Sequence, residues 1–164
     1  MGQIFWLLIK ELGCVIIISK NYDRISLDGN LLRVSAGCLL SKASKFSFEN
    51  SLTGMEEVSG IPGSLGGAVA MNAGAYGVEM KDIIKSVRLV SKTGEILEVS
   101  NEDMDFSYRH SKVFDDDLVV SEAIFELKKM IKKKSMKNMR ILQIEGLQNN
   151  LLIKNLQVLL SKDL

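Results

Sequence analysis

Alternating hydrophobic and polar positions near the start of the chain predict strands that pair as a hairpin. Residues 14–19 form a β-branched apolar run between polar residues, which is typical of a buried strand. Residues 28–30 read Asp-Gly-Asn and favour a turn. Residues 31–36 then alternate in part, with Leu32 and Val34 on one face. We therefore expect a β-hairpin around residues 28–30.

The hydrophobic spacing becomes helical after this predicted hairpin. Leu40, Ala43 and Phe46 recur at intervals of three residues. This spacing places their side chains on one face of a helix, so residues 41–50 are expected to form a short helix.

Strand-like patterns return in the second half of the chain. Residues 83–91 and 95–99 are two apolar runs separated by Lys-Thr-Gly, and Gly94 can adopt the positive φ of a tight turn. These runs predict a second hairpin. Residues 118–127 are rich in apolar and β-branched side chains and predict a further strand.

Between these elements, residues 59–77 contain six glycines and the only proline of the chain. Flexible linkers are hydrophilic, whereas these glycines alternate with apolar residues such as Leu65 and Val69, so a packed and tightly turning backbone is expected. Glycine also lets backbone N–H groups approach an anion closely. The P-loop and Rossmann patterns are absent. Close packing and pyrophosphate binding therefore both stay open.

Composition excludes several classes of function. The chain has 164 residues, 46% of them hydrophobic, which suits one domain with one core. Its 21 Lys and Arg balance 20 Asp and Glu, so charge indicates no nucleic-acid partner. One histidine, His110, and two distant cysteines, Cys14 and Cys38, indicate no metal site and no redox pair. Both cysteines are interpreted as buried free thiols.

The apolar runs at residues 4–9 and 15–18 are interrupted by Lys10 and Glu11, well short of the ~20 residues that a membrane span needs. The start of the chain also lacks the pattern of a signal peptide. We expect no membrane segment and a cytoplasmic protein. The basic run at residues 128–134 has no accompanying aromatic residues and is interpreted as incidental charge.

Two ordered motifs carry a family resemblance. The first comprises Gly60-Ile61-Pro62-Gly63-Ser64, Gly66-Gly67-Ala68 and Met71-Asn72-Ala73-Gly74-Ala75-Tyr76-Gly77. The second is Phe106-Ser107-Tyr108-Arg109-His110-Ser111, which fits a Tyr-Arg-x-Ser pattern. Together they closely resemble the UDP-N-acetylenolpyruvoylglucosamine reductase family, the FAD enzymes of peptidoglycan precursor synthesis. The likeness extends over roughly residues 13–127.

The resemblance implies an α+β fold, namely an FAD-binding domain of the vanillyl-alcohol-oxidase type that a substrate domain follows. In this family NADPH reduces the flavin, and the flavin then passes hydride to the enolpyruvyl double bond of a UDP-sugar. A serine donates the proton. FAD is thus the implied cofactor, NADPH the reductant and a UDP-sugar the substrate, and we expect a monomer.

The resemblance also implies the site residues. FAD is expected to bind along the backbone of the glycine-rich segment, with a hydrogen bond from the Asn72 side chain. The cofactor-binding residues are Gly60, Ile61, Pro62, Gly63, Ser64, Gly66, Gly67, Asn72, Ala73 and Gly74. Arg109 matches the family's catalytic arginine, which also binds the enolpyruvyl carboxylate, because a fixed guanidinium stabilises developing negative charge. Tyr108 is expected either to bind substrate or to pack in the core.

Other charged residues near these motifs are assigned no chemical role. His110 and Lys112 are expected to be exposed neighbours of the second motif. Glu79 and Asp82 are expected to lie on a solvated helix or loop face.

The sequence departs from the family in two ways. It lacks the downstream part of the family's pattern, namely the Gly-Ser-x-Phe-Lys motif with the proton-donating serine and a glutamate near the C-terminus. It also lacks the upstream Gly-Ser-Asn-Leu-Leu-Val loop that holds the flavin pyrophosphate. Permissible codons for residues 1–12, read in a shifted frame, encode a close variant of that loop, and a shift after residue 129 restores the serine motif. We therefore predict out-of-frame segments at residues 1–12 and 130–164 around a partial FAD-binding domain at residues 13–129.

These departures predict weak FAD binding and no turnover. Two alternatives remain open. The chain can be a flavin-binding module or inert remnant without its own reaction, or an FAD oxidase of the same superfamily.

Overall fold

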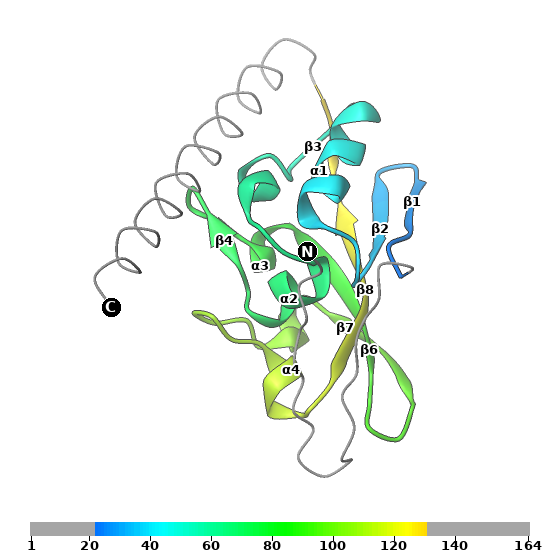
Figure 1. Ribbon diagram of the computed structural model, residues 1–164, viewed down its shortest axis with the longest axis vertical. Coiled ribbons are helices and arrows are strands. Elements are labelled where there is room, and N and C mark those ends of the chain that lie inside the picture. The colour runs from blue at the N-terminus through cyan, green and yellow to red at the C-terminus, as the bar shows by residue number, and fades with distance from the viewer. Residues whose placement is uncertain (1–21, 131–164) are drawn as a thin grey trace, which may run out of the picture.

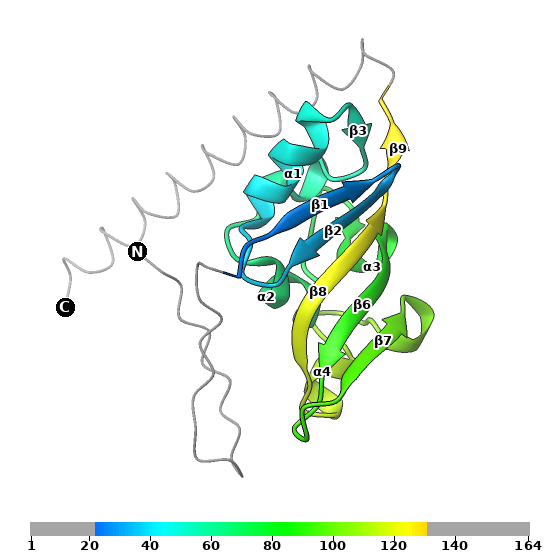
Figure 2. The same cartoon turned by 90° about the vertical axis from the view of Figure 1, so that its right-hand side faces the viewer.

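The computed structural model describes residues 22–130, and Figures 1 and 2 show them as one main sheet with helices against it. The strand predicted at residues 14–19 lies outside the described residues. So do the segment at residues 1–12 and all but the first residue of the segment at residues 130–164.

Five antiparallel strands form the main sheet in the order β1-β2-β8-β6-β7. The strands are β1 (Ile25–Asp28), β2 (Leu31–Ser35), β6 (Ile84–Val90), β7 (Ile96–Ser100) and β8 (Val119–Glu126). Both predicted hairpins are confirmed, since β1 pairs with β2 and β6 pairs with β7. The strand expected at residues 118–127 is β8, which joins the two hairpins into one sheet (Figure 2).

Short helices lie along the chain between the two hairpins and after them. They are α1 (Leu40–Glu49), the 3₁₀ helix η1 (Glu57–Gly60), α2 (Leu65–Ala70), α3 (Met80–Ile83), the 3₁₀ helix η2 (Glu102–Met104) and α4 (Lys112–Asp115). The helix predicted at residues 41–50 is therefore confirmed as α1. The helix α2 packs against β2 and β8.

Two pairs of very short strands complete the described fold. β3 (Leu52–Thr53) pairs with β9 (Lys128–Lys129). The first two residues of the basic run therefore lie beside the segment that follows α1. β4 (Gly74–Ala75) pairs with β5 (Val78–Glu79) and forms a small hairpin after α2. This hairpin continues directly into α3.

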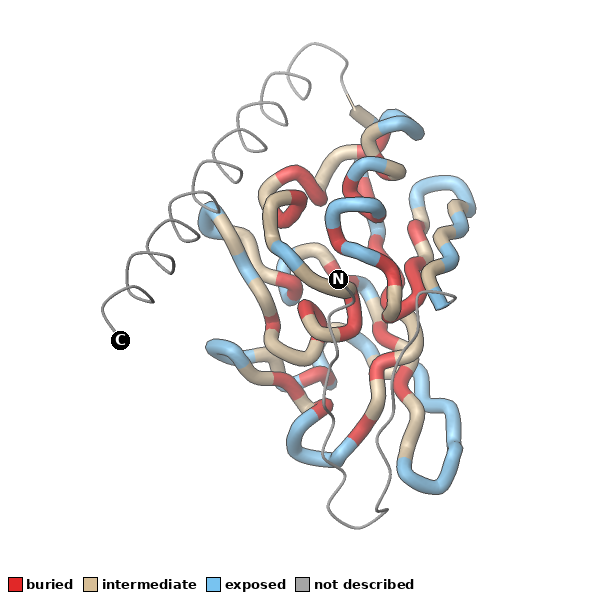
Figure 3. Tube along the Cα trace, in the orientation of Figure 1, coloured by how far each residue is buried: buried red, intermediate tan, exposed pale blue. Residues whose placement is uncertain are grey.

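The core lies between the helices and one face of the main sheet. Leu32 and Val34 of β2 and Phe125 of β8 are fully buried, as are Leu65 and Val69 of α2. Figure 3 shows buried residues gathered where the helices meet the sheet, whereas the β6–β7 turn is exposed. The pattern confirms the predicted buried face of β2, and the packing of helices on an antiparallel sheet confirms the α+β class.

Cys38 is fully buried and carries a free thiol, as predicted. Burial raises the pKa of this thiol, so that the reactive thiolate is disfavoured. Cys14 lies outside the described residues. Within residues 22–130 no helix has the length and apolar character needed to cross a membrane.

Candidate active site

The glycine-rich segment is tied to the residues that follow β2. The Leu65 N–H donates to the carbonyl oxygen of Cys38 at 2.8 Å, and the Gly66 N–H donates to that of Ala36 at 2.9 Å. Because these two N–H groups already donate to protein carbonyls, they are not available to a bound phosphate. The two bonds hold the start of α2 against the end of β2.

Close packing explains Gly66, whereas other residues of the segment stay accessible. A Cβ at Gly66 would lie 3.0 Å from the Cβ of Ala36, so a larger residue would push the two segments apart. Gly63 has a φ of 141°, which favours glycine. Ser64 and Gly67 are half-buried, and their N–H groups bond to no other described residue. Within the described part of the chain, the segment therefore combines a packing role with two backbone donors that have no partner there.

The β4–β5 hairpin ends in a tight turn whose first residue is a tyrosine. Tyr76 and Gly77 have φ values of 53° and 84°, which correspond to the left-handed turns that join two-residue hairpins. Tyr76 is 48% exposed at the tip. A Cβ at Gly74 would lie 2.8 Å from the carbonyl oxygen of Val78, so the hairpin requires glycine there.

Asn72 connects three parts of the site. Its Nδ2 donates to Glu79 Oε2 at 2.8 Å and to the carbonyl oxygen of Ser107 at 3.0 Å. Its Oδ1 accepts from the Lys81 N–H at 3.0 Å. The side chain is 4% exposed, and protein groups already occupy both of its donor hydrogens. A hydrogen bond from Nδ2 to FAD, as predicted, would have to replace one of these two.

Glu79 is held in place by its neighbours. The Lys81 ammonium group lies 2.8 Å from Glu79 Oε2, and this hydrogen bond, followed by the one from Asn72, lowers the pKa of Glu79. The same contact raises the pKa of Lys81. Glu79 also forms a reciprocal capping box with Asp82 at the start of α3. Glu79, whose side chain is 35% exposed, and Asp82, which is exposed, therefore lie on a solvated face as predicted, and Glu79 is in addition bound by Asn72 and Lys81.

Arg109 lies in a tight turn that Ser107 and His110 close with two backbone hydrogen bonds, at 3.1 and 3.3 Å. Arg109 has a φ of 54°, a conformation that such turns usually give to glycine or asparagine. Tyr108 is 86% exposed, so the alternative that it packs in the core is wrong. Substrate binding by Tyr108 stays a prediction.

His110 interacts with two residues of α4. Its Nε2 lies 3.0 Å from Asp115, and its ring stacks on Phe114 with centroids 5.8 Å apart. The expectation that His110 is an exposed neighbour is confirmed by its 40% exposed side chain.

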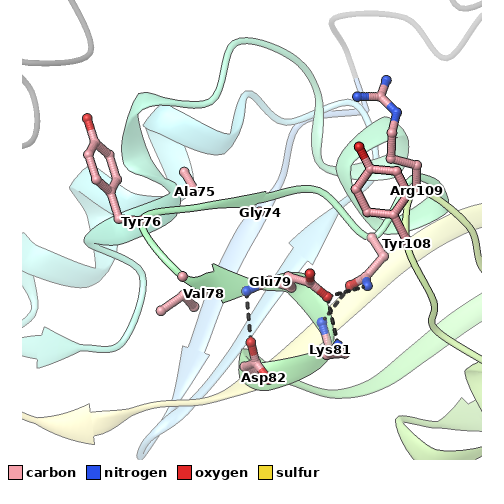
Figure 4. A pocket seen from close by; sticks show the side chains of 11 residues that line it. Gly74, Ala75, Tyr76, Val78, Glu79, Lys81, Asp82, Tyr108 and Arg109 are labelled. Carbon is pink, nitrogen blue, oxygen red and sulfur yellow. Dashed lines mark hydrogen bonds and ion pairs between the residues drawn. The ribbon is translucent and has the colours of Figure 1, made fainter.

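An open pocket of about 630 Å³ brings four of the predicted residues together, namely Asn72, Gly74, Tyr108 and Arg109. Figure 4 shows the β4–β5 hairpin crossing this pocket, with Tyr76 at one end and Tyr108 and Arg109 at the other. The predicted residues between Gly60 and Gly67, and Ala73, do not line it. The pocket therefore unites the second motif with only the last part of the first.

The charges in the pocket differ in their availability. Lys81 is paired with Glu79, whereas the Arg109 guanidinium forms no ion pair with a described residue. Arg109 is thus the cation of this pocket that can bind an anionic group such as a carboxylate.

Sequence reasoning assigned no separate role to Ser111, the last residue of the second motif. This serine is fully buried, and its Oγ donates to the carbonyl oxygen of Ala70 at 2.8 Å. Its place in the Tyr-Arg-x-Ser pattern was the available signal.

Comparison with known families gives a match to the FAD binding domain family over residues 7–100. The chain belongs to this family. It is 46% identical over 115 residues to UDP-N-acetylenolpyruvoylglucosamine reductase from Clostridioides difficile, an alignment that covers 70% of this chain and 38% of the relative. With the enzyme of the same name from Lactobacillus acidophilus it shares 40% identity over 130 residues, covering 78% of this chain and 44% of the relative.

A solved structure supports the same assignment. The UDP-N-acetylenolpyruvylglucosamine reductase from Thermus caldophilus superposes with a TM-score of 0.68 and 28% identity, over 77% of this chain and 46% of the other. The expected FAD-binding fold and the family resemblance are therefore confirmed. The chain spans about two fifths of the length of the curated relatives it matches, 38% and 44% of the two named here.

Proposed function

We propose that this chain is the FAD-binding part of a UDP-N-acetylenolpyruvoylglucosamine reductase, a cytoplasmic and monomeric enzyme that reduces UDP-N-acetylglucosamine enolpyruvate with NADPH. One observation carries the proposal. Arg109, exposed and free of ion pairs with described residues, shares a pocket with Asn72 and Gly74, which belong to the last part of the glycine-rich motif. An anion-binding cation beside a cofactor segment suits a flavoenzyme whose substrate carries a carboxylate.

The residues of the chain fit two of the three tasks that this reaction sets. The N–H groups of Ser64 and Gly67, which have no partner within residues 22–130, suit the polar groups of FAD. Arg109 would bind the substrate carboxylate and stabilise the charge that develops beside it. Bound FAD would supply the transfer of hydride from NADPH to the enolpyruvyl group.

The third task is protonation of the carbanion that hydride addition leaves on the substrate, and no residue within 22–130 is assigned to it. The serine motif that performs it in the family does not occur in the 164-residue sequence. The family's upstream pyrophosphate loop is also missing from the sequence. We therefore propose that the chain binds FAD weakly and turns over no substrate.

Flavin titration of the purified chain tests the cofactor proposal. We expect added FAD to bind with quenching of its fluorescence. Gly63→Ala should weaken binding, because a Cβ is strained at that φ, whereas Arg109→Ala should leave it unchanged. Thermal unfolding of each variant checks that the fold persists. Absence of flavin binding by a folded chain would favour the inert remnant.

Activity measurements separate the remaining alternatives. No NADPH-dependent reduction of the enolpyruvyl substrate is expected, and turnover would contradict the proposed inactivity. Oxidation of small alcohols or hydroxy acids would favour an oxidase of the same superfamily.

The altered reading frames remain a proposal of their own. We propose that residues 1–12 and 130–164 are read out of frame relative to the domain between them. Sequencing the DNA tests this directly, because shifted frames must then encode the flavin loop and the serine motif. Frames without these motifs would remove the proposal.

A further inference from the structure

The turn that carries Arg109 is fastened at both of its ends by buried polar side chains. Before the turn, the carbonyl oxygen of Ser107 accepts a hydrogen bond of 3.0 Å from Asn72 Nδ2. After it, Ser111 Oγ donates to the carbonyl oxygen of Ala70 at 2.8 Å. Asn72 is 4% exposed and Ser111 is 0% exposed, so water competes little for either bond.

Both attachments lead to the same place in the fold. Ala70 is the last residue of α2, and Asn72 follows it by two residues. The Arg109 turn is therefore joined at both ends to the C-terminal end of the helix that contains Gly66 and Gly67. The two bonds join residues that are 35 and 41 positions apart in the sequence, and they hold the turn and the end of α2 together.

The backbone conformation of Arg109 explains why the turn needs to be held in place. A non-glycine residue at a φ of 54° is strained and persists only where its surroundings impose that conformation. The two backbone bonds between Ser107 and His110 close the turn, but they do not fix it to the rest of the domain. Asn72 and Ser111 supply the bonds that do.

We infer that Asn72 and Ser111 are positioning residues that fix Arg109 relative to the glycine-rich segment. The inference rests on the proposed function, in which a cofactor lies along that segment and an anionic substrate group meets Arg109. A constant separation between the two requires that the helix and the turn move together. Neither side chain needs to contact the ligands for this role.

Hydrogen exchange of the full chain, measured residue by residue without any ligand, tests the inference. In Ser111→Ala the amides of Ser107 and His110 should exchange roughly tenfold faster, the factor expected for loss of one buried hydrogen bond. Asn72→Ala should have the same local effect. Ser111→Cys keeps the shape of the side chain but is a weaker donor, so it should loosen the turn to an intermediate degree.

Ser44→Ala is the matched control. Ser44 is also a buried serine, and its Oγ donates to the carbonyl oxygen of Met55 at the same distance of 2.8 Å. This variant should leave exchange in the Arg109 turn unchanged. If Ser111→Ala, or Ser111→Cys where the alanine variant does not fold, gives the same exchange map as Ser44→Ala, the positioning role is overturned.

The exchange result is independent of flavin binding. If the chain binds no FAD but the Ser111 and Asn72 variants loosen the turn, the proposed function is contradicted and the attachment of the turn to α2 is supported. A chain that binds FAD but shows no local loosening retains the function and overturns the positioning role.

Discussion

Three non-glycine residues that line the pocket, Asn72, Tyr76 and Arg109, have φ values of 41°, 53° and 54°. All three lie in the left-handed region, which asparagine tolerates but which costs roughly 1–3 kcal/mol at Tyr76 and Arg109. Such strain is retained where a side chain must be presented at a given place. The pocket therefore combines strained backbone with exposed aromatic and cationic side chains, as binding sites often do.

Relief of this strain should be measurable at Arg109. We expect Arg109→Gly to be about 1 kcal/mol more stable than Arg109→Ala, since both remove the guanidinium but only glycine removes the Cβ. Urea unfolding of the two variants gives the difference. At Arg88, inside β6, the order should reverse, because glycine weakens a strand interior. Equal stability of the two Arg109 variants would show that the turn is unstrained.

The carboxylate of Glu79 should make the free energy of unfolding depend on pH in the acid range. Its pKa is lowered from the ordinary value of 4.5 by Lys81 and then by Asn72. The folded state thus gains stability above pH 4.5 and loses it as the pH falls through the lowered pKa. Glu79→Gln should lower the urea midpoint at pH 7 and approach the parent chain in acid.

Lys81→Met provides the control for Glu79. Because Lys81 is the largest cause of the lowered pKa, the acid-dependent difference between Glu79 and glutamine should shrink in this background. A difference that stays the same in both backgrounds would assign the effect to another group.

At the scale of elements, local signals sufficed for the hairpins and failed for α2. Gly29 and Gly94 have φ values of 62° and 85°, and both turns were predictable because glycine favours this conformation. The helix α2 contains Gly66 and Gly67, and glycine costs about 1 kcal/mol in a helix. It forms because hydrogen bonds from its first turn reach residues near β2, which no local pattern reveals.

The β4–β5 hairpin should be sensitive to substitution of its first glycine. A Cβ at Gly74 would lie 2.8 Å from both the Val78 carbonyl oxygen and the Glu79 Cγ, so Gly74→Ala should cost about 1–3 kcal/mol of stability. Urea unfolding measures the loss.

Gly94→Ala separates backbone strain from steric contact in this comparison. Gly94 has a positive φ, but its Cβ would enter open space. The variant should therefore disturb only the β6–β7 turn. An unchanged stability of Gly74→Ala would mean that the hairpin opens to accept the methyl group without cost.

At the scale of the whole molecule, stability depends on the central strand β8. Phe125 is fully buried there, so Phe125→Ala should lower the free energy of unfolding by about 3–5 kcal/mol. That is a large part of the ~5–15 kcal/mol typical of a domain. Ile96→Ala, at a side chain 69% exposed on β7, should change it by about 0.5 kcal/mol or less. Denaturation followed by circular dichroism compares the two, and a small loss for Phe125→Ala would contradict a single shared core.

The candidate site was predictable where a motif names the residue and not where the fold assembles the contacts. The second motif identified Arg109 and Tyr108, and the structure places both at the pocket with Asn72 and Gly74. The sequence does not show that the Asn72 amide is already fully engaged, because its partners lie 7 to 35 residues away. Roles that depend on such distant contacts emerge only from three-dimensional structure.

The central place of β8 also has a consequence for biosynthesis. On the ribosome the two hairpins can form as soon as their own residues emerge, yet neither pairs with the other, because β8 separates β2 from β6. Until residues 119–126 leave the exit tunnel, the nascent chain presents two incomplete half-sheets with unpaired edges. Chaperone binding or aggregation during translation should therefore be greatest in the interval between synthesis of β6 and release of β8.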